Sequence, residues 1–123
     1  MTNVVRHLLL QRTVQVRFDF DTLRALEGHN AATRSDVIRD AIRAYVDPLV
    51  ARLDGGQELD WSAHGRHMER PESFGSATSV RVAADLLERM DRVEANARGL
   101  GHRHVSRSSL IRDSVRHYLT KRG

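Results

Sequence analysis

The sequence predicts a mainly α-helical fold with a two-stranded antiparallel β-ribbon, built from a strand–helix–helix unit that occurs twice. Two observations predict this fold. Residues 34–46 (RSDVIRDAIRAYV) and 107–119 (RSSLIRDSVRHYL) share seven identities over thirteen positions. Each of these segments also follows a stretch of alternating polar and apolar residues, which is typical of a half-buried strand. Because internal similarity indicates a repeated structural unit, both copies are expected to have the same element order.

The repeated segments are expected to be helices. In both, the core positions recur at i, i+1, i+4, i+5, i+8 and i+9, which is one stripe on a helix of 3.6 residues per turn. These positions are Val37, Ile38, Ala41, Ile42, Tyr45 and Val46 in the first copy, and Leu110, Ile111, Ser114, Val115, Tyr118 and Leu119 in the second. Thr33 or Ser35 is expected to cap the first helix, and Ser106 or Ser108 the second, because Ser and Thr are favoured N-cap residues.

The segments before these helices predict strands with one buried face. In the first copy, Val14, Val16 and Phe18 are expected to face the core, and Thr13, Gln15 and Arg17 the solvent. In the second copy, Val80 and Val82 are expected to face the core, and Ala77, Ser79 and Arg81 the solvent. A single strand forms no sheet, and a unit of about 40 residues buries too small a core. The two strands are therefore expected to pair with each other, antiparallel and within one chain.

A further helix is expected between each strand and its repeated segment. After the first strand it is short: Asp19 or Asp21 caps it, Leu23 and Leu26 face the core, and Gly28 ends it. The strands are 64 residues apart and the last helices 73, so the second copy has nine extra residues in this region. Its middle helix is expected to be longer. The core residues of that helix are Leu86, Leu87, Met90, Val93 and Ala97, after a start near Asp85.

This pattern also predicts the organisation of the chain. It comprises an N-terminal extension (1–11), a first ribbon-forming repeat (12–53), a linker (54–75) and a second repeat (76–120). The last helix of the first repeat is expected to run past Asp47-Pro48 and stop at Gly55-Gly56. The linker contains glycine, proline and charged residues without a sustained period. Trp61 and Phe74 are nevertheless expected to pack on a domain.

Composition narrows the class of protein. The chain has 123 residues, 40% of them hydrophobic, and no cysteine, which excludes disulfides and thiolate metal sites. No stretch approaches the ~20 apolar residues of a membrane span, so no membrane partner is expected and the protein is predicted to be cytoplasmic. The formal net charge is +4. The positively charged side chains are almost all arginines, since Lys121 is the only lysine. This charge is compatible with nucleic acid, but a GC-rich genome would also favour arginine.

At this point the residues resemble a known family. A strand [VT]-x-V-R-[FV], a leucine-bearing helix and a second helix with [TS]-R-S-x-x-I-R-D are similar to the ribbon-helix-helix (MetJ/Arc-like) DNA-binding fold. The resemblance covers residues 12–46 and 77–119. The family builds its fold from two chains, whereas this sequence resembles a tandem form with both repeats in one chain, an intramolecular pseudo-dimer.

The resemblance implies a site on double-stranded DNA. Family members insert the ribbon into the major groove, so the implied base-contacting side chains are Thr13, Gln15, Arg17, Ala77, Ser79 and Arg81. Arg17 and Arg81 suit guanine, Gln15 suits adenine, and Ala77 suits a thymine methyl group. The starts of the last helices are implied to bind phosphate, through Thr33, Arg34, Ser35, Ser106, Arg107 and Ser108. Because the base-contacting side chains of the two strands differ, the expected target has unlike half-sites.

Other charged residues and the histidines have simpler structural interpretations. The helix arginines, Arg39, Arg43, Arg112 and Arg116, are expected to pair with Asp36, Asp40 or Asp113 rather than to contact DNA. Two histidine pairs, His64 with His67 and His102 with His104, lack the thiolates or the H-E-x-x-H frame of a zinc site, so no metal and no cofactor are expected. No nucleophile motif, phosphate loop or buried carboxylate pair is present, so the chain is not expected to be an enzyme.

The expected function is therefore sequence-specific binding of double-stranded DNA at the nucleoid, with transcriptional repression as the main role. Partition, or an accessory role in a plasmid or phage relaxosome, is the alternative within DNA binding. An antitoxin is a further alternative, although few residues follow the second repeat, so the linker would have to bind the toxin. The last alternative is a pure dimerisation module. If the repeats do not pair within the chain, self-association of two molecules is expected.

Overall fold

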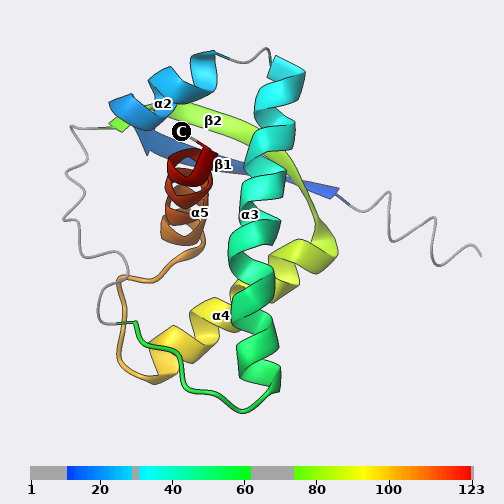
Figure 1. Ribbon diagram of the computed structural model, residues 1–123, viewed down its shortest axis with the longest axis vertical. Coiled ribbons are helices and arrows are strands. Elements are labelled where there is room, and N and C mark those ends of the chain that lie inside the picture. The colour runs from blue at the N-terminus through cyan, green and yellow to red at the C-terminus, as the bar shows by residue number, and fades with distance from the viewer. Residues whose placement is uncertain (1–10, 29–30, 62–73, 123) are drawn as a thin grey trace, which may run out of the picture.

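The computed structural model describes residues 11–28, 31–61 and 74–122. Their elements, in order, are β1 (Gln11–Asp19), α2 (Phe20–Glu27), α3 (Ala31–Asp54), β2 (Phe74–Ala83), α4 (Ala84–Gly99) and α5 (Arg107–Arg122). The fold is mainly helical, and the strands form one two-stranded antiparallel sheet, as the sequence predicts. Figure 1 shows the ribbon passing behind α3, with α2 at one of its ends.

The strands pair in a register that is centred on equivalent residues. Gln15 lies opposite Ser79, and these two positions differ by 64, the distance between the two strand motifs. Val14 therefore lies opposite Val80 in the core, and Thr13 opposite Arg81 on the other face. The alternation is as predicted: the side chains of Val14, Val16, Phe18, Val80 and Val82 are buried, and those of Thr13, Gln15, Arg17, Ala77, Ser79 and Arg81 are exposed.

The middle helices differ in length, as expected. Asp19 caps α2 by accepting a hydrogen bond from the amide of Thr22 (3.2 Å), and Gly28 follows the last residue of this helix. α2 has 8 residues and α4 has 16. All five of the predicted core residues of α4 are buried. The extra residues of the second half therefore lengthen its middle helix.

The start of α5 was predicted correctly and the start of α3 was not. Ser106 precedes α5 and exchanges hydrogen bonds with Ser109, amide to hydroxyl in both directions (2.8 and 3.1 Å), which satisfies its own amide and one free amide of the first turn. α3 begins earlier than expected, at Ala31, so neither Thr33 nor Ser35 is its N-cap. The reason is that two alanines, the strongest helix formers, precede Thr33 and extend the helix.

The second half of α3 packs against α4 and widens the core. α3 continues through Pro48 as one helix to Asp54, and Gly56, with a φ of 76°, follows. Asp47 binds Arg89 of α4 (2.6 Å). Residues of the expected linker join this core: Leu59 and Trp61 are buried, and the Trp61 Nε1 donates to Asn96 Oδ1 (3.1 Å). The side chain of Phe74 lies outside the described part of the structure.

None of the helices in the described ranges combines the length and apolar character that crossing a bilayer requires. The core is aliphatic, with Phe18 and Trp61 as its buried aromatic residues among those described. Each buried Leu, Ile, Val or Met side chain contributes about 1.5–3 kcal/mol through removal from water. The ribbon is thus fixed from one side by a packed helical layer, and its opposite face carries polar side chains.

Candidate nucleic-acid interface

The exposed face of the ribbon brings the six strand residues together in three cross-strand pairs. These pairs are Thr13 with Arg81, Gln15 with Ser79, and Arg17 with Ala77. Residues 11–18 and 75–83 contain three arginines and no carboxylate. The face is therefore polar, hydrogen-bonding and positively charged. Such a surface suits a polyanion with acceptor groups on its edges.

The two ribbon arginines lie at opposite ends of this face and differ in their contacts. The Arg17 Nε donates to the carbonyl oxygen of Gly75 (2.9 Å), so this side chain lies along the neighbouring strand. Among the described residues, no hydrogen bond or ion pair engages the Arg81 guanidinium. The backbone carbonyl of Arg81, in contrast, accepts a hydrogen bond from Arg39 (3.2 Å). The ends of the ribbon are therefore chemically unequal.

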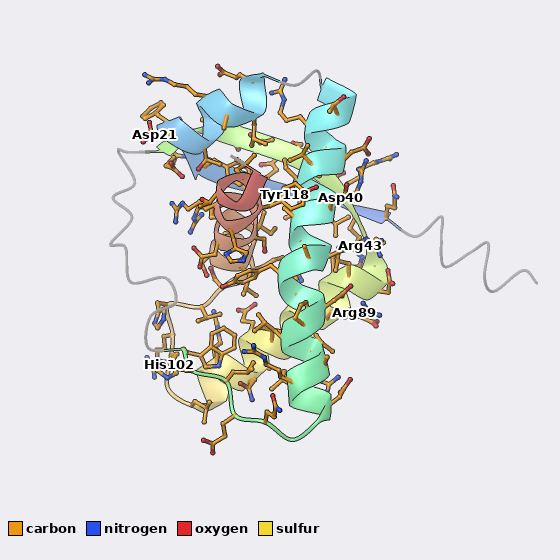
Figure 2. The ribbon with its side chains drawn as sticks, viewed as in Figure 1. Asp21, Asp40, Arg43, Arg89, His102 and Tyr118 are labelled. Carbon is orange, nitrogen blue, oxygen red and sulfur yellow. The ribbon has the colours of Figure 1, made fainter. Side chains whose placement is uncertain are left out.

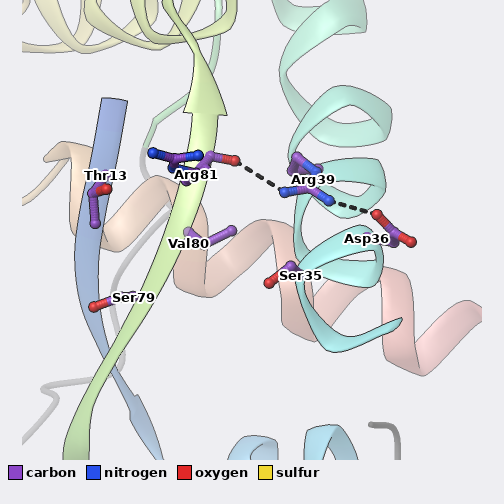
Figure 3. Close-up of a pocket in the computed structure, with 7 residues that line it drawn as sticks. All are labelled: Thr13, Ser35, Asp36, Arg39, Ser79, Val80 and Arg81. Atoms are coloured by element: carbon purple, nitrogen blue, oxygen red, sulfur yellow. Dashed lines mark hydrogen bonds and ion pairs between the residues drawn. The ribbon is translucent and has the colours of Figure 1, made fainter. Parts of the chain in front are cut away.

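The start of α3 lies beside one end of the ribbon. A hollow of about 400 Å³ separates them and is lined by Thr13, Ser35, Asp36, Arg39, Ser79, Val80 and Arg81 (Figure 3). Ser35 thus lies near the base-contacting candidates, whereas Thr33 and Arg34 are half-buried in the first turn of α3 and do not line the hollow. The first four amides of a helix lack intrahelical partners and attract anions. Asp36 adds a carboxylate here, and Arg39 binds it.

The start of α5 differs from that of α3. Ser106 is engaged in the reciprocal cap with Ser109, and Ser108 is half-buried. Arg107 binds both carboxylate oxygens of Asp91 in α4 (2.8 and 3.0 Å). Among the described residues no carboxylate binds Arg34, although α2 ends at Glu27, the residue 64 positions before Asp91. A phosphate at α5 would therefore have to compete with Asp91 for Arg107.

Sequence reasoning missed one role of the helix arginines. Arg39 pairs with Asp36, as expected, but it also donates to the ribbon carbonyl of Arg81. Arg112 donates to the carbonyl of Arg17 (3.4 Å) in the same manner. The sequence shows that Arg39 and Arg112 occupy the same position in the two repeated segments, which indicates a shared role. A contact from a helix to a distant strand cannot be inferred from that position alone.

The other two helix arginines have different environments. Arg116 binds Asp113 (3.4 Å), as expected, and also Asp19 (3.1 Å), the N-cap of α2. Arg43 is exposed, as is Asp40, and Figure 2 labels both on α3. No described carboxylate forms an ion pair with Arg43.

The histidines form no metal-like cluster in the described ranges. The rings of His102 and His104 meet edge to face with centroids 5.6 Å apart. Within residues 11–28, 31–61 and 74–122, no group of three or more His, Cys, Asp or Glu side chains is placed to hold an ion. His64 and His67 lie outside the described residues.

The candidate interface thus consists of a polar ribbon face, with the start of α3 beside Arg81 and with Arg112 of α5 in contact with the backbone of Arg17. Its groups offer hydrogen bonds and positive charge. Comparison of the chain with protein-family models, with curated protein sequences and with solved structures gave no match.

Proposed function

We propose that this chain is a sequence-specific double-stranded DNA-binding protein of the ribbon-helix-helix type, with both repeats in one polypeptide. The β1–β2 ribbon inserts into the major groove as an intramolecular pseudo-dimer. Its biological role is transcriptional repression, in which occupancy of an operator blocks access of the polymerase. The proposal rests on the observed ribbon and on the sequence resemblance described above.

The observation that carries the proposal is the exposed face of the ribbon. Its six polar or small side chains come from two strands and are held in one register, while the opposite face is fixed by the helical core. The major groove is about 12 Å wide and admits a two-stranded ribbon. A cationic ribbon that carries no carboxylate in residues 11–18 and 75–83 suits the geometry and the electrostatics of that groove.

The register also predicts the spacing of the bases. Arg81 lies opposite Thr13, which is four residues from Arg17 along β1. Four residues of a strand span about 14 Å, since each rises about 3.4 Å. The same length of duplex holds about four base-pair steps of roughly 3.4 Å. Two guanines contacted by Arg17 and Arg81 are therefore expected about four base pairs apart, with an adenine between them for Gln15.

The helix starts supply contacts to the DNA backbone. The free amides at the beginning of α3 and α5 and the positive ends of the helix dipoles favour phosphate. These contacts fix the position of the ribbon but do not select a sequence. Because Arg107 is held by Asp91 and Arg34 is not, we expect the α3 side to bind phosphate more strongly.

Selection from a library of random duplexes tests this function. The expected result is enrichment of a short non-palindromic motif with two guanines about four base pairs apart. Binding of the enriched duplex is then measured by fluorescence anisotropy against a scrambled duplex of equal length. Equal affinity for both duplexes, at several salt concentrations, would refute sequence-specific binding. Crosslinking and mapping of bound chromosomal or plasmid fragments distinguishes a promoter from a partition site or a transfer origin.

A further inference from the structure

Arg39 of α3 and Arg112 of α5 make the same contact in the two halves of the chain. Their positions differ by 73, the distance between the repeated segments, and the two ribbon arginines differ by 64, the distance between the strands. Arg39 Nη1 donates to the carbonyl of Arg81 (3.2 Å), and Arg112 Nη1 donates to the carbonyl of Arg17 (3.4 Å). The contact is therefore made twice, by equivalent donors on equivalent acceptors.

The two contacts are crossed between the halves. The helix of the first half holds the strand of the second half, and the helix of the second half holds the strand of the first (Figure 3 shows the Arg39 contact). Each acceptor is the backbone of a residue whose side chain projects from the exposed face of the ribbon. A hydrogen bond at that carbonyl fixes the backbone from which the exposed arginine extends.

Asp36 extends the contact on the α3 side. Its carboxylate binds Arg39 Nη2 (2.5 Å), and it lies in the second turn of α3 beside the hollow at the end of the ribbon. A continuous chain of polar contacts thus runs from the start of α3 through Arg39 to Arg81. The equivalent of Asp36 in the second copy is Ser109, since 109 minus 36 is 73, and Ser109 is engaged in capping α5.

We propose that Arg39 and Arg112 are positioning residues for base recognition, Arg39 for Arg81 and Arg112 for Arg17. They hold each ribbon arginine at a fixed distance from the helix start that faces the DNA backbone, so that phosphate contact and base contact are made in one geometry. They act through the ribbon backbone and do not themselves bind DNA. This inference rests on the proposed function and adds two residues that determine specificity.

Double-mutant cycles on the full chain test the inference. The measured quantity is discrimination: the affinity for the selected duplex divided by the affinity for a duplex with one guanine pair replaced. Arg39→Gln is expected to lower discrimination about threefold to tenfold at the pair contacted by Arg81, and to leave the pair contacted by Arg17 unchanged. Arg112→Gln is expected to show the reverse. In an Arg81→Ala background, Arg39→Gln should produce no further loss at that pair.

Arg43→Gln is the matched control, because Arg43 is exposed on the same helix one turn away and the substitution removes the same charge. It should leave discrimination at both pairs unchanged. Arg39→Lys keeps the charge without the planar fork and should resemble Arg39→Gln. Asp36→Asn should reproduce part of the same loss. Circular dichroism and thermal unfolding establish that each variant is folded. Arg39→Lys replaces Arg39→Gln, and Arg112→Lys replaces Arg112→Gln, if the glutamine variant is not folded.

Three outcomes would overturn the inference. Additive effects in the cycle would show that Arg39 does not act through Arg81. Equal losses at both guanine pairs would show a general structural role. If Arg39→Gln reduces the slope of log affinity against log salt concentration by about one unit and leaves discrimination unchanged, Arg39 contacts a phosphate instead. If the wild-type chain selects no duplex at all, the proposed function itself is refuted, which is a different result from selection with additive cycles.

Discussion

Replacement of Asp19 is expected to destabilise the fold, by a smaller amount in Asp19→Asn than in Asp19→Ala. Asp19 lies between β1 and α2, and its side chain is 25% exposed. Its carboxylate accepts hydrogen bonds from the Thr22 amide (3.2 Å) and hydroxyl (2.7 Å), and it binds Arg116 at 3.1 Å. Asp19→Asn keeps an acceptable N-cap but loses the negative charge. Asp19→Ala loses both the cap and the ion pair.

The contacts set the size of each step. Loss of the charge of a partly buried pair is expected to lower the free energy of unfolding by about 1 kcal/mol in Asp19→Asn. Loss of the cap contributes about 0.5–2 kcal/mol more, so Asp19→Ala should lose about 1.5–3 kcal/mol. At roughly 4 °C per kcal/mol for a domain of this length, the melting temperature should fall by about 4 °C in Asp19→Asn and by about 6–12 °C in Asp19→Ala.

The effect of Asp19 should depend on pH. Burial raises the pKa of its carboxyl, but the hydrogen bonds from Thr22 and the charge of Arg116 outweigh burial, so the pKa lies below its ordinary value of 3.8. A carboxyl with a lowered folded-state pKa stabilises the protein above the unfolded-state value, and this stabilisation is lost as the pH falls through the folded-state pKa. The advantage of wild type over Asp19→Asn should be complete at pH 6 and vanish in strong acid.

Urea unfolding followed by circular dichroism measures these differences. Asp21→Asn is the control, because Asp21 is exposed in the first turn of the same helix and its loss removes only a helix-dipole interaction of at most about 0.5 kcal/mol. Equal destabilisation by Asp19→Asn and Asp21→Asn at pH 6 would contradict the role of Arg116. A difference between wild type and Asp19→Asn that persists unchanged at pH 2 would contradict the lowered pKa.

Three further predictions concern DNA contact, the wider core and the half-buried phenol of Tyr45. Arg17→Ala should cost about 1–3 kcal/mol of binding to the selected duplex and relax preference at one base pair, whereas Arg34→Ala should weaken all duplexes equally and reduce the salt slope by about one, both measured by anisotropy. Trp61→Phe loses the hydrogen bond to Asn96 and part of a buried ring, so it should lower the free energy of unfolding in urea by at least about 0.5–1.5 kcal/mol, and an unchanged free energy would contradict this. Burial, and then the charge of Asp113, raises the pKa of Tyr45 to about 12. Its stabilising effect should therefore be present below pH 10 and lost as the pH rises through 12, and a tyrosine absorbance titration should lose this late step in Tyr45→Phe.

The elements were predictable because their signals are local. The alternation around Val14 and Val16 fixes which face of β1 is buried, and the stripe from Val37 to Val46 fixes the buried face of α3. The equivalence of the two copies also made the antiparallel pairing foreseeable. The start of α3 was wrong by a few residues, because helix propensity upstream of Thr33 prevailed over its capping preference.

The details of the candidate site were less predictable because they depend on long-range packing. The bond between Arg107 and Asp91 joins the middle of α4 to the start of α5, so it depends on how these two helices pack. The contacts from Arg39 and Arg112 to strand carbonyls arise from how the helices cross the ribbon, which no periodicity encodes. The burial of Trp61 likewise requires the unbroken continuation of α3 past Pro48.

Pairing of β1 with β2 inside one polypeptide has a consequence for how this surface can change. In a symmetric dimer of identical subunits, every substitution on the ribbon appears twice and alters both ends at once. Here each of the six outward positions occurs once, so a codon change modifies a single point on the surface. The ends of the ribbon are therefore free to diverge independently, and the assembly of the surface does not depend on the concentration of the protein.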